Sequence, residues 1–205
     1  MYFFTADLHL GTDEIIERES RPFRNIDEFE DVFVNNVNAV ATADDILYVI
    51  GDYLTFNNRG GEKFDSTTNF NIVDLKEILR KIKRVVPKAI LINGTAEQRA
   101  IDDLFNGDFE AMREVVKECG FLDFLPDADI EFKGIKFHLM HHPKDYKKGV
   151  LNLFGHTHRS TGLWKPFGLN MGVDLNYFRP FSEDEIMKQL EFKEWWDKDE
   201  NNLCM

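Results

Sequence analysis

Short apolar runs alternate with longer amphipathic segments along this chain, and charged or turn-forming residues close each run. Brief runs rich in β-branched and aromatic residues predict buried strands at residues 2–6, 46–50 and 89–92. Between them, apolar residues recur at helical spacing over residues 26–41 and 72–86, which predicts crossover helices. This alternation of strands and helices predicts an α/β fold.

The second half of the chain is richer in strand patterns. Residues 129–132 and 135–140 read as two strands joined by a tight turn, and residues 150–154 as another strand. A final helix is expected to begin at Ser182, because its hydroxyl can cap the first turn while Glu185 reciprocates three residues later. No internal repeat and no linker rich in Pro, Gly or Ser divides the sequence.

Length, composition and charge limit the domain number and the partners. With 205 residues, 43% hydrophobic content and 19 Phe, we expect one domain over residues 1–196, followed by an acidic tail at 197–205. The formal net charge of -12 argues against an extended nucleic-acid-binding surface. The sequence contains no run of about 18 apolar residues, so we expect neither a membrane span nor a membrane partner. Cys119 and Cys204 are too few for a disulfide framework, so we expect a reduced protein in the cytoplasm.

Histidine and aspartate gather in short motifs. Five of the six histidines lie in or beside them: Asp7-Leu8-His9, Gly51-Asp52, His141-His142 and Gly155-His156-Thr157-His158. Each motif falls where a predicted strand ends, and ligands gather at the carboxyl ends of strands in open α/β sheets. Carboxylate oxygen and imidazole nitrogen without cysteine favour Mn, Fe or Zn in a reactive site over a structural zinc. The pattern therefore indicates a metalloenzyme.

The order of these motifs resembles the calcineurin-like metallophosphoesterases, in particular their small bacterial and phage-type members. The similarity runs from residue 3 to about residue 186 and includes a third motif near Gly94, His141 before Pro143, and the motif that begins at Gly155. It implies a four-layer αββα sandwich, in which two mixed sheets are flanked by helices and a two-metal site lies along one sheet edge.

The resemblance also implies roles for individual residues. Asp7, His9 and His158 would hold the first metal, Asp52 would bridge both metals and act in catalysis, and His141, His156 and the residue at position 95, Thr95, would serve the second. Two divalent ions are implied, with Mn preferred and Fe, Zn or Ni as alternatives. The implied reaction is hydrolysis of a small phosphomonoester or phosphodiester by in-line attack of a metal-bridging hydroxide.

The third motif departs from the family pattern of Gly-Asn-His followed by an acidic residue. The sequence has Gly94-Thr95-Ala96-Glu97, so a hydroxyl replaces the amide ligand and Ala96 replaces a histidine that can donate a proton. Asn93 is an alternative source of the amide, and His142 is a candidate for the missing acid, with a position on the rim as its alternative. The same departure leaves open a weakened or inactive scaffold that binds a protein partner.

Three charged residues outside these motifs are further candidates. Arg21 and Arg24 can bind a substrate phosphate, since guanidinium suits bidentate contacts, or form ion pairs with nearby acids. Asp174 can orient a ligand histidine or simply end a strand. The sequence gives no indication of the oligomeric state.

Overall fold

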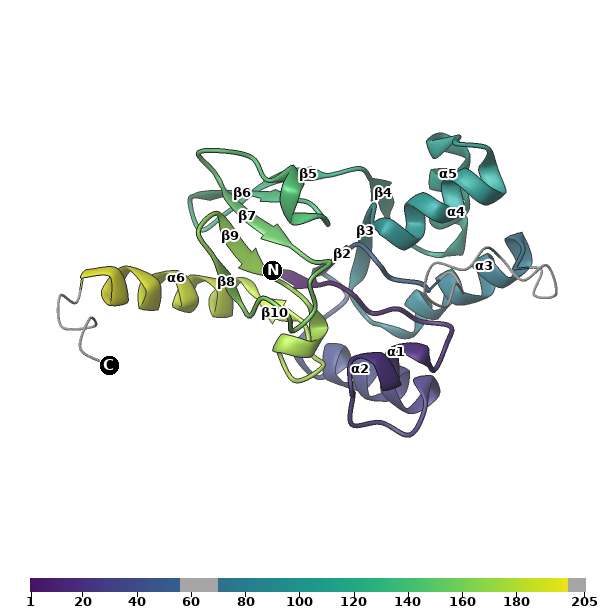
Figure 1. Cartoon of the computed structure of the whole chain (residues 1–205), viewed down its shortest axis with the longest axis horizontal. Coiled ribbons are helices and arrows are strands. Elements are labelled where there is room, and N and C mark those ends of the chain that lie inside the picture. The colour runs from purple at the N-terminus through teal and green to yellow at the C-terminus, as the bar shows by residue number, and fades with distance from the viewer. Residues whose placement is uncertain (56–69, 199–205) are drawn as a thin grey trace.

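The computed structural model describes residues 1–55 and 70–198, so residues 199–205 of the predicted tail lie outside the described part (Figure 1). The first sheet has the order β10-β1-β2-β3-β4. Its strands are β1 (Tyr2–Thr5), β2 (Ile46–Ile50), β3 (Lys88–Ile92), β4 (Asp123–Leu125) and β10 (Phe181–Ser182). The pairs from β1 to β4 are parallel, and β10 pairs antiparallel with β1.

The second sheet has the order β5-β6-β7-β9-β8. Its strands are β5 (Ala128–Phe132), β6 (Ile135–Leu139), β7 (Leu151–Phe154), β8 (Trp164–Lys165) and β9 (Gly168–Asn170). The central strands β6, β7 and β9 are parallel, whereas β5 and β8 pair antiparallel with their neighbours at the edges. The prediction of an α/β fold with two mixed sheets is therefore confirmed.

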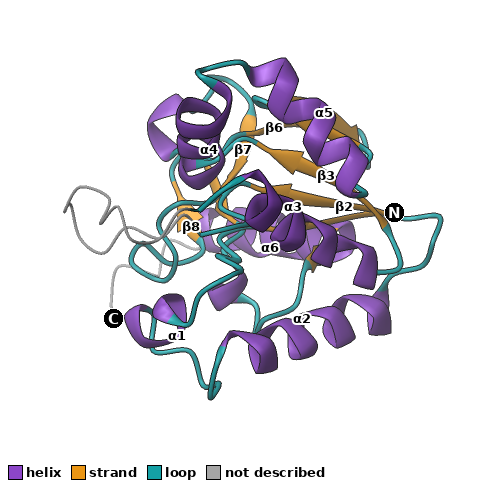
Figure 2. Ribbon diagram, turned by 90° about the vertical axis from the view of Figure 1, so that its right-hand side faces the viewer, coloured by secondary structure: helices purple, strands orange, loops and turns teal. Residues whose placement is uncertain are grey.

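A layer of helices covers one face of the first sheet, as Figure 2 shows for α3 and α5 in front of β2 and β3. These helices are α1 (Glu14–Arg18), α2 (Ile26–Val40), α3 (Ile72–Arg80), α4 (Thr95–Phe105) and α5 (Phe109–Cys119). Phe29, Phe33 and Val37 recur at a spacing of four residues on α2 and pack in one buried cluster with Leu47 and Val49 of β2. That stripe is the apolar face from which this helix was predicted.

A second core lies between the two sheets. Phe4 and Tyr48 stack with ring centroids 5.7 Å apart on the first sheet, and Phe132 and Phe137 stack at 4.2 Å on the second. Fully burying one such side chain contributes roughly 1.5–3 kcal/mol. The two sheets are thus held face to face by aromatic packing, with their strand ends fixed relative to each other.

The last helix, α6 (Glu183–Lys198), begins as predicted. The Glu185 amide donates to Ser182 Oγ at 3.2 Å and the Ser182 amide donates to Glu185 Oε2 at 2.9 Å, which is a capping box. Ile186 joins the core between the sheets, and the helix then runs away from them (Figure 1). The helix starts at β10, the edge strand of the first sheet, and Met187 and Leu190 also pack against the core between the sheets, so the fourth layer of helices stays a prediction. Within the described ranges, no helix is long and apolar enough to cross a membrane.

Candidate metal centre

Two groups of potential metal ligands lie next to each other where strands of both sheets end. Asp7, His9 and His158 form the first group, and the potential ligand atoms lie within 4.8 Å of one another. The second group consists of Asp52, His141 and His156 under the same limit. Asp52 Oδ2 lies 3.5 Å from His9 Nε2 and 3.4 Å from His141 Nε2, so this carboxylate faces both groups. The structure brings together the six Asp and His ligands that the sequence suggested.

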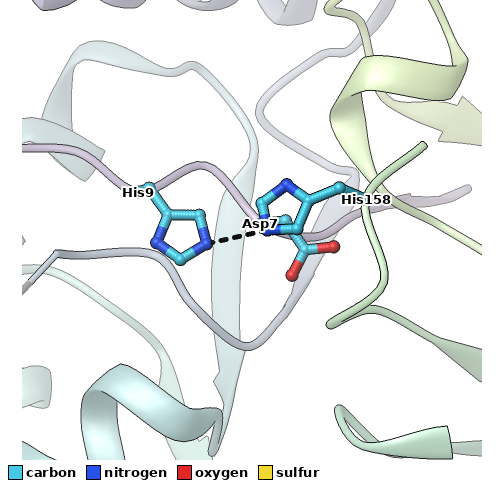
Figure 3. A group of neighbouring side chains, drawn as sticks. All are labelled: Asp7, His9 and His158. Atoms are coloured by element: carbon cyan, nitrogen blue, oxygen red, sulfur yellow. Dashed lines mark hydrogen bonds between the residues drawn. The ribbon is translucent and has the colours of Figure 1, made fainter. Parts of the chain in front are cut away.

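Hydrogen bonds on the far side of the rings orient two of these histidines. His141 Nδ1 lies 2.9 Å from the Ile50 carbonyl oxygen, and His158 Nδ1 lies 3.4 Å from Asp174 Oδ2. Each contact directs Nε2 toward the centre, which is the arrangement typical of metal-binding histidines. In Figure 3, His9 Nε2 and His158 Nε2 face each other at 3.2 Å beside the Asp7 carboxylate. The predicted orienting role of Asp174 agrees with this contact.

Unpartnered polar atoms at the centre test whether a cation fits. Asp7 Oδ1 accepts a hydrogen bond from the His156 amide at 2.8 Å, but the buried Asp7 Oδ2 has no hydrogen-bond partner. The buried His141 Nε2 likewise makes no hydrogen bond. Leaving such atoms buried without a partner is costly unless an ion satisfies them. A mixed set of carboxylate oxygen and imidazole nitrogen suits divalent ions such as Mn, Fe or Zn, so the residues fit the implied metals.

Burial sets the protonation of most ligands. It lowers the pKa of His9 to about 3 and that of His156 to about 4, which keeps both rings neutral and able to bind a metal. Burial raises the pKa of Asp7. For His141, burial lowers the pKa, but the carboxylates of Asp52, 3.4 Å from Nε2, and of Asp7 outweigh it and raise the pKa to about 9. A metal ion would have to displace that proton.

The backbone at the ligands is in an unusual conformation. Asp7, His9, Asp52, His156 and His158 have φ angles of 61°, 54°, 50°, 73° and 45°, in the left-handed region that favours glycine. Such positions cost on the order of 1–3 kcal/mol each and cluster at functional sites. Backbone hydrogen bonds hold two of them, because the Asp7 amide donates to the Gly51 carbonyl at 3.1 Å and the His9 amide to the Asp52 carbonyl at 2.9 Å. The sequence pattern does not show this strain.

Glu97 organises the turn that presents Asp52. Its buried carboxylate accepts hydrogen bonds from the amides of Asp52 at 2.8 Å, Tyr53 at 2.9 Å and Gly94 at 3.1 Å. Burial, with the charge of Asp52, raises the pKa of Glu97 to about 7. Gly51 has φ +74°, and a Cβ there would collide with the His141 ring. Glu97 was not predicted as a site residue, although it ends the third motif.

The third motif lies beside the second group. The Ala96 amide donates to Asp52 Oδ1 at 2.8 Å, so the backbone at this position holds the carboxylate even though the side chain is only a methyl group. Thr95 Oγ1 lies 3.4 Å from His156 Nδ1, which places the hydroxyl next to the second group. Asn93 directs its side-chain amide nitrogen to Gln98 Oε1 at 2.9 Å.

Two cavities open on the centre. One, of about 290 Å³, is lined by ligands of both groups together with Arg18 and Arg99. The other, of about 440 Å³, is lined by His141, His142 and other residues. Thr95 and Arg99 line both cavities. Sequence reasoning did not select Arg18 or Arg99, because neither lies in a motif.

The two arginines that were predicted to bind substrate lie elsewhere. The Arg21 side chain is 0% exposed and donates to both oxygens of Asp174 at 2.8 and 2.9 Å and to the carbonyls of Leu8 and Asp7. The prediction that Arg21 binds substrate is wrong, because its side chain is buried and its Nε, Nη1 and Nη2 atoms all donate hydrogen bonds inside the protein. Arg24 is 86% exposed, pairs with Glu28 at 3.1 Å and lines neither cavity, so its position does not support substrate contact.

His142 borders the second cavity, next to the second group. Its ring centroid lies 4.1 Å from that of His156, and its Nδ1 accepts a hydrogen bond from the Lys144 amide at 3.1 Å. Because Nδ1 accepts, the neutral ring carries its proton on Nε2. Burial, with the charge of Lys144, lowers the pKa of His142.

Comparison with known proteins identifies a shared fold. No protein-family model matches the chain. An uncharacterized protein from Methanocaldococcus jannaschii is 24% identical over 200 residues, which cover 92% of this chain and 90% of that protein. The crystal structure of a protein of unknown function from Aquifex aeolicus is 23% identical with a TM-score of 0.60, covering 92% of this chain and 98% of that one. This similarity shows the fold and leaves the activity open.

A phosphoesterase from E. coli is a more distant match. It is 16% identical with a TM-score of 0.40, covering 83% of this chain and 77% of the other. That similarity is too low to support an argument about this protein. The assignment of function therefore rests on the geometry of the centre.

Proposed function

We propose that the protein is a metal-dependent phosphoesterase that binds two divalent ions, with Mn²⁺ preferred. The observation that carries this proposal is the pair of adjacent donor groups. Asp52 Oδ2 faces both groups, and Asp7 Oδ2 and His141 Nε2 are buried there without hydrogen-bond partners. Each group offers both carboxylate oxygen and imidazole nitrogen, and the two cavities give a small phosphorylated substrate access to them.

The residues would divide the work as follows. Asp7, His9 and His158 would hold one ion, and His141 and His156 the other, while Asp52 faces both. Two ions at such a centre supply a nucleophile at neutral pH and offset the charge that develops on the phosphoryl oxygens. The protein fixes the position of the Asp52 carboxylate through the Ala96 amide, and Glu97 holds the turn around it. The substrate would be a small phosphomonoester or phosphodiester.

His142 is our candidate for the group that protonates the leaving oxygen. Its ring borders the second cavity, and it would act as the imidazolium, which gives the Nε2 proton to the leaving oxygen and returns to the neutral ring that accepts from the Lys144 amide at Nδ1. General acids contribute about 10²–10⁴-fold, and mainly to reactions with poor leaving groups. We therefore expect His142→Gln to slow hydrolysis of an alkyl phosphate ester much more than that of a p-nitrophenyl ester. An equal effect on both esters would exclude the role.

The proposed function is tested by hydrolysis of bis-p-nitrophenyl phosphate and p-nitrophenyl phosphate by Mn²⁺-loaded protein. We expect turnover that is lost after EDTA treatment and reduced at least about 10³-fold in Asp52→Asn, in which one shared ligand oxygen is replaced. The metal content of both proteins is measured in parallel. Turnover that persists in Asp52→Asn would contradict the proposal.

A second candidate function follows from Thr95 and Ala96, which replace an amide and an imidazole beside the second group. It is a protein-binding scaffold with a weakened centre. Wild-type protein that binds at most one Mn²⁺ per chain at saturation and hydrolyses neither ester would favour the scaffold over the phosphoesterase.

A further inference from the structure

Arg99 occupies a distinctive place beside the centre. It lies on α4, three residues after Ala96, so the two side chains share one face of the helix. Both residues line the first cavity, and Arg99 also lines the second. Because Ala96 contributes only a methyl group next to Asp52, no bulky side chain at that position separates Arg99 from the second group. Arg99 therefore borders both cavities, and each of these cavities also reaches ligands of the second group.

The charge of Arg99 is not neutralised within the described ranges. Its side chain is exposed. Within the described ranges, 1–55 and 70–198, it makes no ion pair and no hydrogen bond. The other arginine of the first cavity, Arg18, differs in this respect, because its Nε lies 3.3 Å from Glu19 Oε1. Arg99 is thus the arginine of this cavity with all of its donors available to a ligand.

The surroundings make such a cation important for an anionic substrate. Glu14, Glu19 and Asp52 line the first cavity, and the chain as a whole has a formal charge of -12. A phosphate group that approaches the centre therefore meets carboxylates on its way. Guanidinium presents parallel N–H donors that match two phosphate oxygens, and such charge-assisted bonds are among the stronger hydrogen bonds in proteins.

We propose that Arg99 binds the phosphoryl oxygens of the substrate where the two cavities adjoin, beside the metal ligands that line them. This inference rests on the proposed function for its substrate class and assigns the substrate contact to a residue outside every motif of the sequence. The groups attached to the phosphate would extend into the cavities on either side of Thr95 and Arg99.

The test compares Arg99→Met with Arg18→Met, which removes the same charge from the same cavity. Binding of inorganic phosphate to the Mn²⁺-loaded proteins is measured by calorimetry, and kcat/KM is measured on bis-p-nitrophenyl phosphate. For Arg99→Met we expect phosphate binding and kcat/KM to weaken by about 10- to 100-fold, the range for a hydrogen bond to a charged group. We expect Mn²⁺ content and melting temperature to stay unchanged, Arg18→Met to change either quantity by less than about threefold, and Arg99→Lys to recover part of the loss.

The outcomes separate this inference from the proposed function. Hydrolysis by wild type that is equally fast in Arg99→Met overturns the role of Arg99 and leaves the phosphoesterase standing. Phosphate binding that depends on Arg99 in a protein that hydrolyses neither ester keeps the role of Arg99 and removes the enzyme. Absence of phosphate binding by the wild type, or an equal loss in Arg18→Met, overturns the inference.

Discussion

The two ligand groups differ in how the protein supports them. The first group, Asp7, His9 and His158, is entirely buried and lies against the Arg21–Asp174 ion pair, whose side chains are both 0% exposed. The second group includes the half-buried His156, and its ligands border both cavities. The first group therefore borders one cavity, through His9 and His158, and is held from behind by a buried ion pair, whereas the second group borders both cavities.

This difference indicates that the first group mainly holds a metal ion in place, whereas the second group also contacts the substrate. Arg21 ties the backbone after β1 to Asp174, and Asp174 in turn contacts His158, so one buried network orients the first group from behind. In the second group, Asp52 is held by the Ala96 amide in the first turn of α4. The residues beside this group, Thr95 and Ala96, have small side chains. The small side chains of Thr95 and Ala96 thus leave room for substrate beside the second group.

Removing the arginine of the buried network should have the largest effect. Arg21→Met leaves the Asp174 carboxylate buried beside His158 without its bidentate partner, and breaking such a pair costs about 3–5 kcal/mol. We expect that loss in the free energy of unfolding from urea titrations. The control is Arg113→Met, whose pair with Asp123 is partly exposed and should cost less than about 1 kcal/mol. Similar losses in both variants would contradict the comparison.

Acid should weaken the same network by a smaller amount. Burial raises the pKa of Asp174, but its hydrogen bonds with His158 and Arg21 outweigh burial and lower the pKa to about 2. A lowered carboxyl pKa stabilises the fold above the pKa of the unfolded chain, near 4, and this contribution is lost as the pH falls toward about 2. We expect up to about 2 kcal/mol from this residue in metal-free protein.

The measurement is the urea midpoint of metal-free protein at pH 5 and pH 3, compared with Asp174→Asn. The variant should be less stable at pH 5 and should lose less stability between the two pH values. An unchanged slope in the variant would show that other carboxyl groups dominate the acid response.

The smallest predicted effect concerns the open side. Thr95→Asn places an amide oxygen beside His156, where the wild type has a hydroxyl 3.4 Å from that ring. We expect the second Mn²⁺ to bind about tenfold more tightly, a gain of about 1.4 kcal/mol, with the first unchanged. Titration of Mn²⁺ followed by electron paramagnetic resonance measures both, and Thr95→Val serves as the control. Tighter binding of the first ion instead would contradict the placement of Thr95 beside the second group.

The sequence predicted much of the framework because its signals are local. The strand from 46 to 50 and the helix from residue 26 are marked by apolar periodicity, and the Ser182–Glu185 capping box is a short-range pattern. The helices α4 and α5 were not predicted, although Met112, Val115 and Val116 of α5 lie at helical spacing. The fourth layer of helices came from a resemblance and stays a prediction.

The site was less predictable than the fold wherever contacts span long distances in the sequence. The six Asp and His ligands were found because each lies in a short motif within four residues of the end of a strand. Arg21 was misread since its partner, Asp174, lies 153 residues away and nothing near Arg21 signals burial. Arg99 was missed because an unpaired charge on a helix has no sequence signature, and only the cavities identify it.

The left-handed backbone at five ligands has a consequence for the life of the protein in a cell. Glycine would adopt these φ angles without strain, yet the chain has Asp or His there, so these ligand positions lower the stability of the folded state. A ligand that binds only the folded state stabilises it according to its free concentration. If the proposed metals bind, the abundance of the protein would rise with their free concentration. The metal-free protein would be the first to unfold and be degraded.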